Sequence, residues 1–576
     1  MVTFPNCNHV FLTYKKARKM KSKLIPFFVM LAISQNTYAL QPPSAGSQLQ
    51  QIPTLPLPTP QEMMPEIKIE SGQPPATPTT DNVKIQVNTL NIIGMHVFKE
   101  ADLIAVSGFK SGQEYTLTDL RAMAAKIADY YHHQGYFVAQ AYLAAQDIKD
   151  NTVSISVLEG QYGKIKLNNQ STMKDSLLNR QLDRIHSGDT IAIDPLENRL
   201  LMLSDLPGVH VTSTLVPGEA VGTSDLLVDV TPAQFITGSV FADNYGNRYT
   251  GEYRVGGNVN FNNITGHADV LSFTGFTAID GLYYGRAGYE TQIGDGRVGI
   301  AYSRLQYRLL REFKDLKAHG DAEDYSIYGI YPLIRTRNNN LYAHLGFDFK
   351  DFQDKIDSTS SITDKEIYVG TASLIGDHRD NWGGGGFDAY ALSWIHGNLN
   401  IQTPAARALD SMTARSNGSY DKLAFNASRL QNLTDVFSIY GRIQGQIASK
   451  NLDISEKMEL GGAYGVRAYP EGEAFADEGY LVNLEARALL PKWSDRIPGR
   501  MQLVAFVDTG SVTINHHAYG PGDNHRTLSG AGVGFDWGDT NNFLVRVSYA
   551  FKLGHEKAIS APDESGRLWV QLVKYF

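Results

Sequence analysis

From about residue 234 to the C-terminus, apolar and polar residues alternate with a period of two, and we find no amphipathic helix of ordinary length there. Across Phe543–Lys552, one face carries the apolar residues Phe543, Val545, Val547, Tyr549 and Phe551. A strand between lipid and an aqueous lumen needs this alternation. A soluble β-sandwich also alternates, but aromatic residues would not be expected at the ends of so many of its strands. The pattern predicts an all-β transmembrane barrel of antiparallel strands.

The alternating stretches number about sixteen, the first near 236–244 and the last near 566–576. Tight turns such as Asn338-Asn339-Asn340 alternate with longer connections. The longer connections are 309–321, 351–365, 398–418, 448–477, 511–526 and 553–565. Short periplasmic turns and long outer loops are the expected asymmetry of a bacterial outer-membrane barrel. The connections therefore predict the orientation of the barrel as well as its size.

The N-terminus has the features of an export signal. A basic stretch ending at Lys23 precedes the apolar run Leu24–Ile33, and Thr37-Tyr38-Ala39 carries small residues where signal peptidase cleaves. The run is too short for a permanent anchor, so residues 1–39 are predicted to be a signal peptide that starts at Met1 or Met20. A buried apolar helix is the alternative. The sole cysteine, Cys7, lies in this presequence, so we expect no disulfides in the mature chain.

Two repeated units separate this signal from the barrel. Residues 40–81 are rich in proline and indicate an extended linker, with room for at most a short plug helix in 40–52. Residues 82–160 have the order strand, helix, helix, strand, strand, at 83–93, 99–106, 117–133, 137–144 and 152–158. Residues 161–232 repeat that order, at 162–167, 173–185, 195–203, 209–215 and 225–230. A tandem repeat is stronger evidence for two modules than either unit alone.

Several functional classes are disfavoured. The net charge of −8 is mild and no Lys/Arg cluster lies outside the N-terminus, so no nucleic-acid partner is expected. No G-x-x-x-x-G-K-[ST] loop occurs, and the glycines of 530–534 lie in an alternating strand, so no nucleotide is expected. The pairs His132-His133 and His516-His517 lack metal-ligand spacing with further ligands. The sequence shows nothing that resembles a catalytic triad or a paired-carboxylate site. We therefore expect no metal, no cofactor and no enzymatic activity.

Short motifs in the repeats and at the start of the barrel form a specific combination. The first repeat contains Gly135 and Tyr136 within YHHQGYFVA (131–139), and Leu158-Glu159-Gly160 ends its last strand. The second repeat contains Leu206-Pro207-Gly208-Val209 and Leu215-Val216-Pro217-Gly218. The start of the barrel contains Asp243-Asn244-Tyr245-Gly246.

With these motifs the chain resembles, over essentially its full mature length, the outer-membrane transporters of two-partner secretion. These are the TpsB or haemolysin secretion/activation type, relatives of the BamA-like assembly factors. The resemblance implies an α+β periplasmic region of two POTRA domains, 82–160 and 161–232. An all-β barrel, 233–576, would follow.

Two further motifs resemble parts of that family. Gly465-Val466-Arg467-Ala468-Tyr469, in the long loop 448–477, resembles a V-R-G-Y loop tip. Phe506-Val507-Asp508-Thr509-Gly510 resembles an F-x-D-x-G strand motif. Parity points Asp508 into the lumen, where a carboxylate favours a cationic partner. The resemblance implies that the loop folds inward and that Arg467 docks on Asp508. The alternative is a solvated arginine and an unrelated carboxylate. Ala468 stands where the family has glycine, so a positive φ there would be strained.

The resemblance also implies a function and partners. The POTRA domains would recognise a secreted partner protein through a secretion domain near its N-terminus, because an extended client can add a strand to an exposed sheet edge. The client would cross the barrel unfolded and fold outside, with activation as a further effect. Outer-membrane lipid and lipopolysaccharide would surround the barrel in a Gram-negative bacterium. A BamA-like assembly factor is the alternative, and a passive porin is less consistent with the two repeats.

Overall fold

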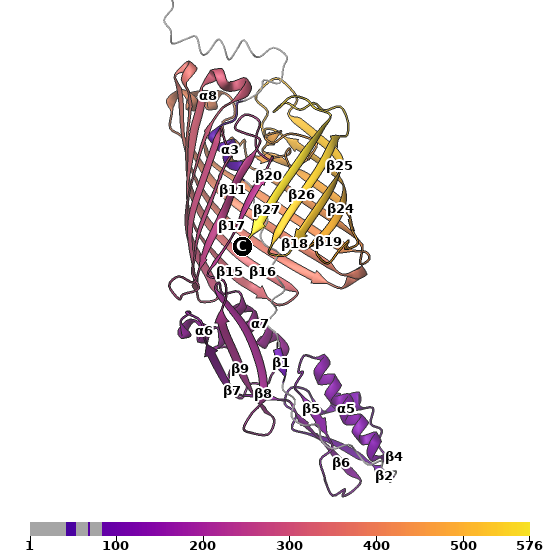
Figure 1. Cartoon of the computed structure of the whole chain (residues 1–576). Helices are drawn as coiled ribbons and strands as arrows, with labels where there is room; N and C mark the ends of the chain where they lie inside the picture. The colour runs from indigo at the N-terminus through magenta and orange to yellow at the C-terminus, as the bar shows by residue number, and fades with distance from the viewer. Residues whose placement is uncertain (1–41, 53–66, 70–82) are drawn as a thin grey trace, which may run out of the picture.

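The computed structural model describes residues 42–52, 67–69 and 83–576. The predicted signal peptide and most of the predicted linker lie outside these residues. A barrel forms the larger part of the molecule, the second α/β unit adjoins one end of it, and the first unit lies farther away (Figure 1). Among the described residues, no helix is both long enough and apolar enough to cross a bilayer.

In the described part of the chain, sixteen antiparallel strands close into a barrel, which confirms the predicted number. Neighbours in sequence pair with one another, and β10 pairs with β27 to close the sheet. The strands are β10 (Ile236–Asp243), β11 (Arg254–Asn262), β12 (Val270–Thr277), β13 (Leu282–Ile293), β14 (Gly296–Arg308), β15 (Ala318–Arg335), β16 (Asn339–Ile356), β17 (Ser361–Asp380), β18 (Gly386–Ile401), β19 (Gly418–Asn432), β20 (Phe437–Ala448), β23 (Glu478–Leu489), β24 (Arg500–Thr513), β25 (His525–Asp539), β26 (Phe543–Lys552) and β27 (Gly566–Tyr575).

The two faces of each strand meet different surroundings. On β26, Tyr549 is exposed on the outer surface, whereas Ser548 is buried on the lumen side. Aromatic rings of neighbouring strands touch on the outer surface, as Phe349 and Tyr368 do with centroids 5.0 Å apart. Aromatic residues gather in this way where a barrel leaves the lipid.

The prediction of a long loop at 351–365 is wrong. The strands β16 and β17 continue through this region, and only residues 357–360 separate them. The outward residues Asp351 and Asp364 are polar, which ends the apolar face, but backbone pairing continues beyond them. The apolar face therefore marks the depth of the membrane and not the end of the strands.

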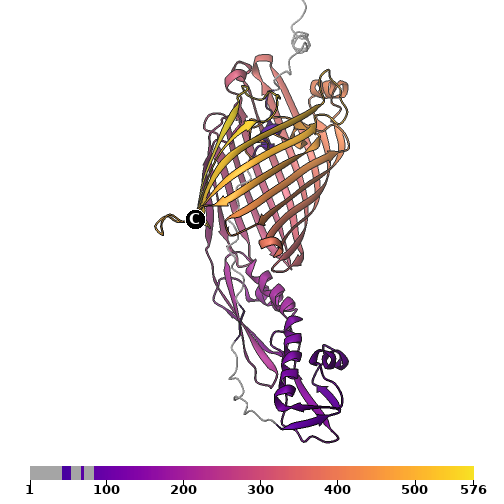
Figure 2. The same ribbon diagram turned by 90° about the vertical axis from the view of Figure 1, so that its right-hand side faces the viewer.

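The other long connections carry short elements. They are the helices η3 (Arg311–Leu316), α8 (Pro404–Met412) and η6 (Ile454–Glu456), and the short strands β21 (Met458–Glu459) and β22 (Phe475–Ala476). Two further short helices, η4 (Asp357–Thr359) and η5 (Trp382–Gly384), lie in the short connections 357–360 and 381–385. The barrel strands tilt strongly, and the long loops gather at the end away from the α/β units (Figure 2).

The first α/β unit contains two small sheets and two helices. One sheet has the order β3-β6-β5, and β2 pairs with β4 in the other. The elements are β2 (Lys84–Val87), β3 (Thr89–Ile93), α4 (Glu100–Ser107), β4 (Gln113–Thr116), α5 (Leu117–His133), β5 (Gln140–Tyr142) and β6 (Thr152–Leu158). The strand expected at 83–93 is divided, and the one expected at 137–144 is shorter. The strand β4 was missed, because four residues are too few to show a period.

The ends of α5 follow from its sequence. The Thr116 hydroxyl accepts from the Asp119 backbone N–H at 3.1 Å, and the Asp119 carboxylate accepts from the Thr116 N–H at 2.8 Å. This capping box starts the helix. Beyond its last turn Gly135 has a φ of 90°, a conformation that favours glycine. Between these ends, Leu120, Ile127 and other apolar residues at helical spacing are buried.

The second unit has one sheet in the order β1-β8-β9-β7, covered by two helices. Its elements are β7 (Gln161–Asn169), α6 (Asp175–Leu182), α7 (Ile193–Ser204), β8 (Val209–Pro217) and β9 (Thr223–Pro232). The added strand β1 (Ile67–Ile69) comes from the predicted linker and pairs in parallel with residues 213–215 of β8. An extended linker was expected there, and part of it is a sheet strand.

A short helix, α3 (Ala45–Gln50), lies inside the barrel (Figure 1). The Ala45 backbone N–H donates to the Asp354 carboxylate on β16 at 2.8 Å. Arg254 on β11 donates to the Gln51 carbonyl at 3.1 Å. A helix of six residues therefore occupies the lumen and is bonded to the wall.

We predict that Leu345→Arg destabilises the barrel. Leu345 is 65% exposed on the outer face of β16, and arginine near the bilayer midplane costs about 2–4 kcal/mol. Asp351→Arg is the matched control. Asp351 lies on the same face of β16 but beyond the aromatic belt that contains Phe349 and Tyr368, and an arginine there should cost less than about 1 kcal/mol. Urea unfolding in liposomes measures both. Equal losses of unfolding free energy in the two variants would contradict this position of the membrane.

Candidate functional site

The long loop 449–477 folds back into the barrel. It leaves β20, forms η6, and then brings β21 and β22 together on either side of the loop tip. The tip residues Val466 and Tyr469 are completely buried. The loop therefore occupies the lumen together with α3.

The structure brings Arg467 of the tip and Asp508 of the wall together. Asp508 lies on the lumen face of β24 with no exposed surface, whereas Leu503 and Val507 point outward. Arg467 Nε and Nη2 donate to the two oxygens of Asp508, each at 2.8 Å. The Arg467 backbone N–H donates to the same carboxylate at 3.1 Å. Two parallel N–H···O bonds are the strongest geometry for this pair, and the backbone bond also fixes the path of the loop.

Three further wall residues complete the site, and the sequence analysis did not name them. Asn483 Nδ2 donates to Asp508 at 2.8 Å and to the Gly465 carbonyl at 3.0 Å. Glu485 accepts from Arg467 Nη1 at 2.8 Å, and Trp569 Nε1 donates to the Arg467 carbonyl at 2.7 Å. Asn483 pairs directly with Asp508 in the sheet. A polar residue in register with Asp508 was the available signal.

The residues of the barrel motif flank Asp508 on its strand. The Arg467 guanidinium lies 3.5 Å from the centroid of the Phe506 ring, a cation–π contact. A Cβ at Gly510 would come within 2.6 Å of the Leu460 side chain. Glycine at this position therefore lets the loop approach the wall.

The loop tip itself is closely packed. A Cβ at Gly465 would lie 2.1 Å from the Leu460 carbonyl oxygen, so only glycine fits. Ala468 does not have a positive φ, so the strain considered for it does not arise. The Ala468 methyl group instead packs on the wall at Gly530, where a Cβ would come within 2.5 Å of it. The Tyr469 hydroxyl donates to the Glu556 carbonyl at 3.0 Å.

In the first α/β unit, Glu159 connects three segments. Its buried carboxylate accepts from the Tyr131 hydroxyl at 2.7 Å and from the backbone N–H groups of His96 and Val97 at 2.7 and 2.8 Å. Burial and the hydrogen bond to Glu159 raise the pKa of Tyr131. The Tyr136 ring lies edge-on to that of Tyr131, with centroids 6.0 Å apart. The Leu158-Glu159-Gly160 motif is therefore a structural centre of the unit.

Two glycines of the motifs lie where the α/β units meet. The Gly135 carbonyl accepts from the Ile193 N–H, and the Gly160 carbonyl accepts from the Ile191 N–H, each at 2.9 Å. Gly160 has a φ of 79°, and a Cβ there would come within 2.4 Å of Val138. Main-chain bonds therefore join the first unit to the start of α7.

The segment Pro207-Gly208 lies between α7 and β8, where the second unit meets the barrel. A Cβ at Gly208 would come within 2.8 Å of Asn263, in the turn between β11 and β12. An ion pair of 2.7 Å joins Arg335, at the end of β15, to Asp205. The second unit is thus fixed to the barrel turns opposite the long loops.

Comparison with known families agrees with this architecture. Residues 222–537 match the family described as haemolysin secretion/activation protein ShlB/FhaC/HecB, and residues 85–160 match the POTRA domain, ShlB-type. The chain belongs to the ShlB/FhaC/HecB family. The resemblance to the haemolysin secretion/activation type is therefore confirmed.

Named relatives of this ShlB-type protein are transporters. It is 30% identical over 473 residues to the heme/hemopexin transporter protein HuxB of Haemophilus influenzae strain Rd, covering 81% of this chain and 82% of that one. It is 24% identical over 412 residues to the outer membrane transporter CdiB of Dickeya dadantii, covering 69% of this chain and 71% of that one.

Solved structures share the fold. CdiB from Escherichia coli superposes with a TM-score of 0.67 at 18% identity, covering 88% of this chain and 93% of that one. BamA from Haemophilus ducreyi, lacking POTRA domains 1–3, gives a TM-score of 0.50 at 15% identity, covering 85% of this chain and all of that one. As a member of its family, the protein is an outer-membrane transporter of two-partner secretion with periplasmic POTRA domains, and it exports a partner protein.

Arg467→Ala is predicted to release the loop tip and to reduce export. It leaves Asp508 buried without its cation, and losing one partner of a buried pair costs about 3–5 kcal/mol. Arg487→Ala is the control, since Arg487 is also an arginine of the lumen wall, but its ion pair of 2.7 Å is with Glu485. Hydrogen exchange of residues 460–470 and the yield of exported partner are the measurements. If the loop tip is as well protected from hydrogen exchange in Arg467→Ala as in the parent, the prediction is contradicted.

Proposed function

We propose that this transporter captures one dedicated protein with its two POTRA domains and passes it through the barrel in an extended form. The protein then folds outside the cell. The partner would present a secretion domain near its N-terminus, and activation of the partner would accompany export. The observation that supports this best is the series of two POTRA units fixed to the barrel through main-chain and ion-pair contacts. A passive pore has no use for such units.

Exposed sheet edges in the POTRA domains are the proposed capture sites, because an edge offers unpaired main-chain groups to an extended client. In the second domain β1 lies on the outer edge of β8, which leaves β7 as the other edge of that sheet. In the three-stranded sheet of the first domain, β3 and β5 are the two edges. The edge strand β3 alternates exposed and buried residues, and Ile93 at its end is 51% exposed. We propose β3 and β5 as the first contacts of the client.

The proposed transport needs no chemical step in the transporter. The periplasm lacks ATP, and the sequence has no phosphate-binding loop. Folding of the exported chain outside can make its return unfavourable, which provides direction. We therefore assign no catalytic residues, and Arg467 and Asp508 have the role of fixing the loop within the export path.

The outer wall is proposed to contact lipid and lipopolysaccharide. Outward apolar residues such as Leu345 and Phe347 are 65% and 49% exposed and suit the hydrocarbon layer. Beyond the aromatic belt the same face of β16 carries Asp351, where polar headgroups would lie.

A second candidate function is the assembly of other barrels into the outer membrane. It is favoured by the similarity of fold to BamA at a TM-score of 0.50. In that case the POTRA edges would bind unfolded barrel strands in place of a soluble client. The two functions differ in what is lost when the POTRA domains are removed.

Deletion of residues 83–160 is predicted to abolish export of the partner protein, because it removes β3 and β5 while leaving the barrel intact. Outer-membrane insertion of the truncated transporter, followed by its heat-modifiable migration, is the control for folding. Unimpaired export would contradict capture by the first POTRA domain. A general loss of other outer-membrane barrels would favour the assembly function.

A further inference from the structure

Three lysines from three barrel strands meet one segment of the long loop. Lys350 on β16 and Lys422 on β19 each lie 2.8 Å from the carboxylate of Glu456. Lys365 on β17 lies 2.8 Å from the carboxylate of Asp453. All five side chains are largely buried on the lumen side, the Glu456 side chain with only 3% of its surface exposed. We call Lys350, Lys365 and Lys422 the lysine cluster.

The lysine cluster holds the main chain as well as the side chains of this segment. The carbonyl of Glu456 accepts from Lys422 Nζ at 2.9 Å and from Gln446 Nε2 at 3.0 Å. Asp453 also accepts from the Ser455 backbone N–H at 3.1 Å and from its hydroxyl at 2.9 Å. The single turn of η6 is therefore fixed at both ends by groups of the wall or of its own cap.

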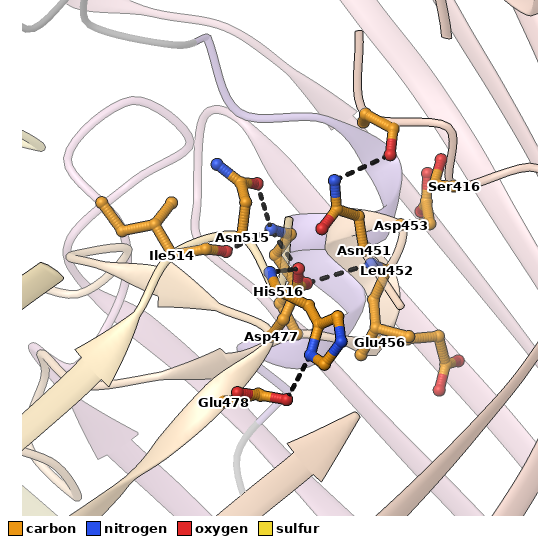
Figure 3. A network of polar contacts seen from close by, with 12 residues as sticks. Ser416, Asn451, Leu452, Asp453, Glu456, Asp477, Glu478, Ile514, Asn515 and His516 are labelled. Atoms are coloured by element: carbon orange, nitrogen blue, oxygen red, sulfur yellow. Dashed lines mark hydrogen bonds and ion pairs between the residues drawn. The ribbon is translucent and has the colours of Figure 1, made fainter. Parts of the chain in front are cut away.

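The base of the loop next to η6 has its own polar network, centred on Asp477 (Figure 3). The fully buried carboxylate of Asp477 accepts from the backbone N–H groups of Leu452 at 3.0 Å and His516 at 2.9 Å. Lys457 lies 3.0 Å from the same carboxylate. None of these contacts involves Arg467 or Asp508, so the first limb of the loop is held independently of its tip.

The helix α3 rests on η6. Gln50 of α3 donates to the Ser455 carbonyl. A Cβ at Gly46 would come within 2.9 Å of the Ser455 Cβ, so this contact requires glycine. An isolated helix of six residues is not stable in water, so α3 stays in the lumen only through contacts of this kind and its bonds to the wall.

We propose that the lysine cluster positions η6 and so retains α3 in the lumen, while the Arg467–Asp508 pair fixes only the tip of the loop. Occlusion of the channel then depends on Lys350, Lys365 and Lys422. Removing the positive charges leaves Asp453 and Glu456 buried without cations, which drives η6 toward water. With η6 displaced, α3 loses its support. This inference rests on the proposal that the barrel lumen is the export path.

The test is the conductance of the purified full-length transporter in planar bilayers. Lys350→Met/Lys422→Met removes two charges at similar side-chain length, and we expect a rise of about tenfold or more in the time spent open, since loss of such pairs is strongly destabilising. Lys355→Met, on β16 but at an outward position, is the matched control and should behave like the parent. Arg467→Ala should raise the open time far less than the double variant does.

A second variant acts from the side of α3. Gly46→Ala adds a methyl group where no room exists and should also open the channel, with little further effect in the double lysine variant. If the double lysine variant does not fold, as judged by heat-modifiable migration, Glu456→Gln replaces it and leaves the wall unchanged.

A folded lysine variant that stays closed like the parent would overturn the proposal, and so would an Arg467→Ala channel that opens as much as the lysine variant. Neither result depends on a client. If the lysine variant opens as expected but the yield of exported partner does not change, the proposed function is contradicted and the role of the lysine cluster is not.

Discussion

In lipid, a backbone N–H or C=O without a partner costs several kcal/mol, so the sixteen strands must pair in a closed ring. The seam between β10 and β27 completes the ring with five residue pairs, against eighteen between β16 and β17. Main-chain bonds of 2.9 and 3.0 Å between Gly238 and the C-terminal Phe576 lengthen the seam. A ring of sixteen strands is also wider than its own side chains can fill. Closure in the membrane therefore creates the lumen that the rest of the chain has to occupy.

The loop that enters that lumen carries charged side chains as well as apolar ones, and burial imposes conditions on the charges. A buried charge is tolerated only with a partner, and the loop 449–477 meets this condition at several points along the wall. Arg467 pairs with Asp508, Glu473 pairs with Arg526, and Asp453 and Glu456 pair with the lysine cluster. Because each pair joins the loop to a different set of strands, the loop cannot shift along the wall without exposing or unpairing a charge. Ion pairs here specify one arrangement of the loop more than they add to the stability of the barrel.

The sequence predicted what depends on local periodicity and left unpredicted what depends on height along the barrel. Alternation of side chains gave the number and order of the strands, and parity gave the face of Asp508. It did not give the ends of β16 and β17, because polarity changes at Asp351 while pairing continues. Nor could parity pair Lys350 with Glu456, because parity gives the face of the strand on which a residue lies and not its height along the barrel. The strand β1 was missed because three residues become a strand only through pairing with β8.

The N-terminal segment is held differently from the loop, and the difference has a physical consequence. The helix α3 (AGSQLQ) carries no charged side chain, and sixteen residues, 51–66, connect it to β1 on the second POTRA domain. Its contacts are single hydrogen bonds and close packing at Gly46, each weaker than a buried ion pair. The loop beneath it is fixed by buried ion pairs, whose separation is costly. A rearrangement that clears the lumen therefore meets less resistance in α3 than in the loop, so α3 should leave first while η6 and the tip of the loop stay in place.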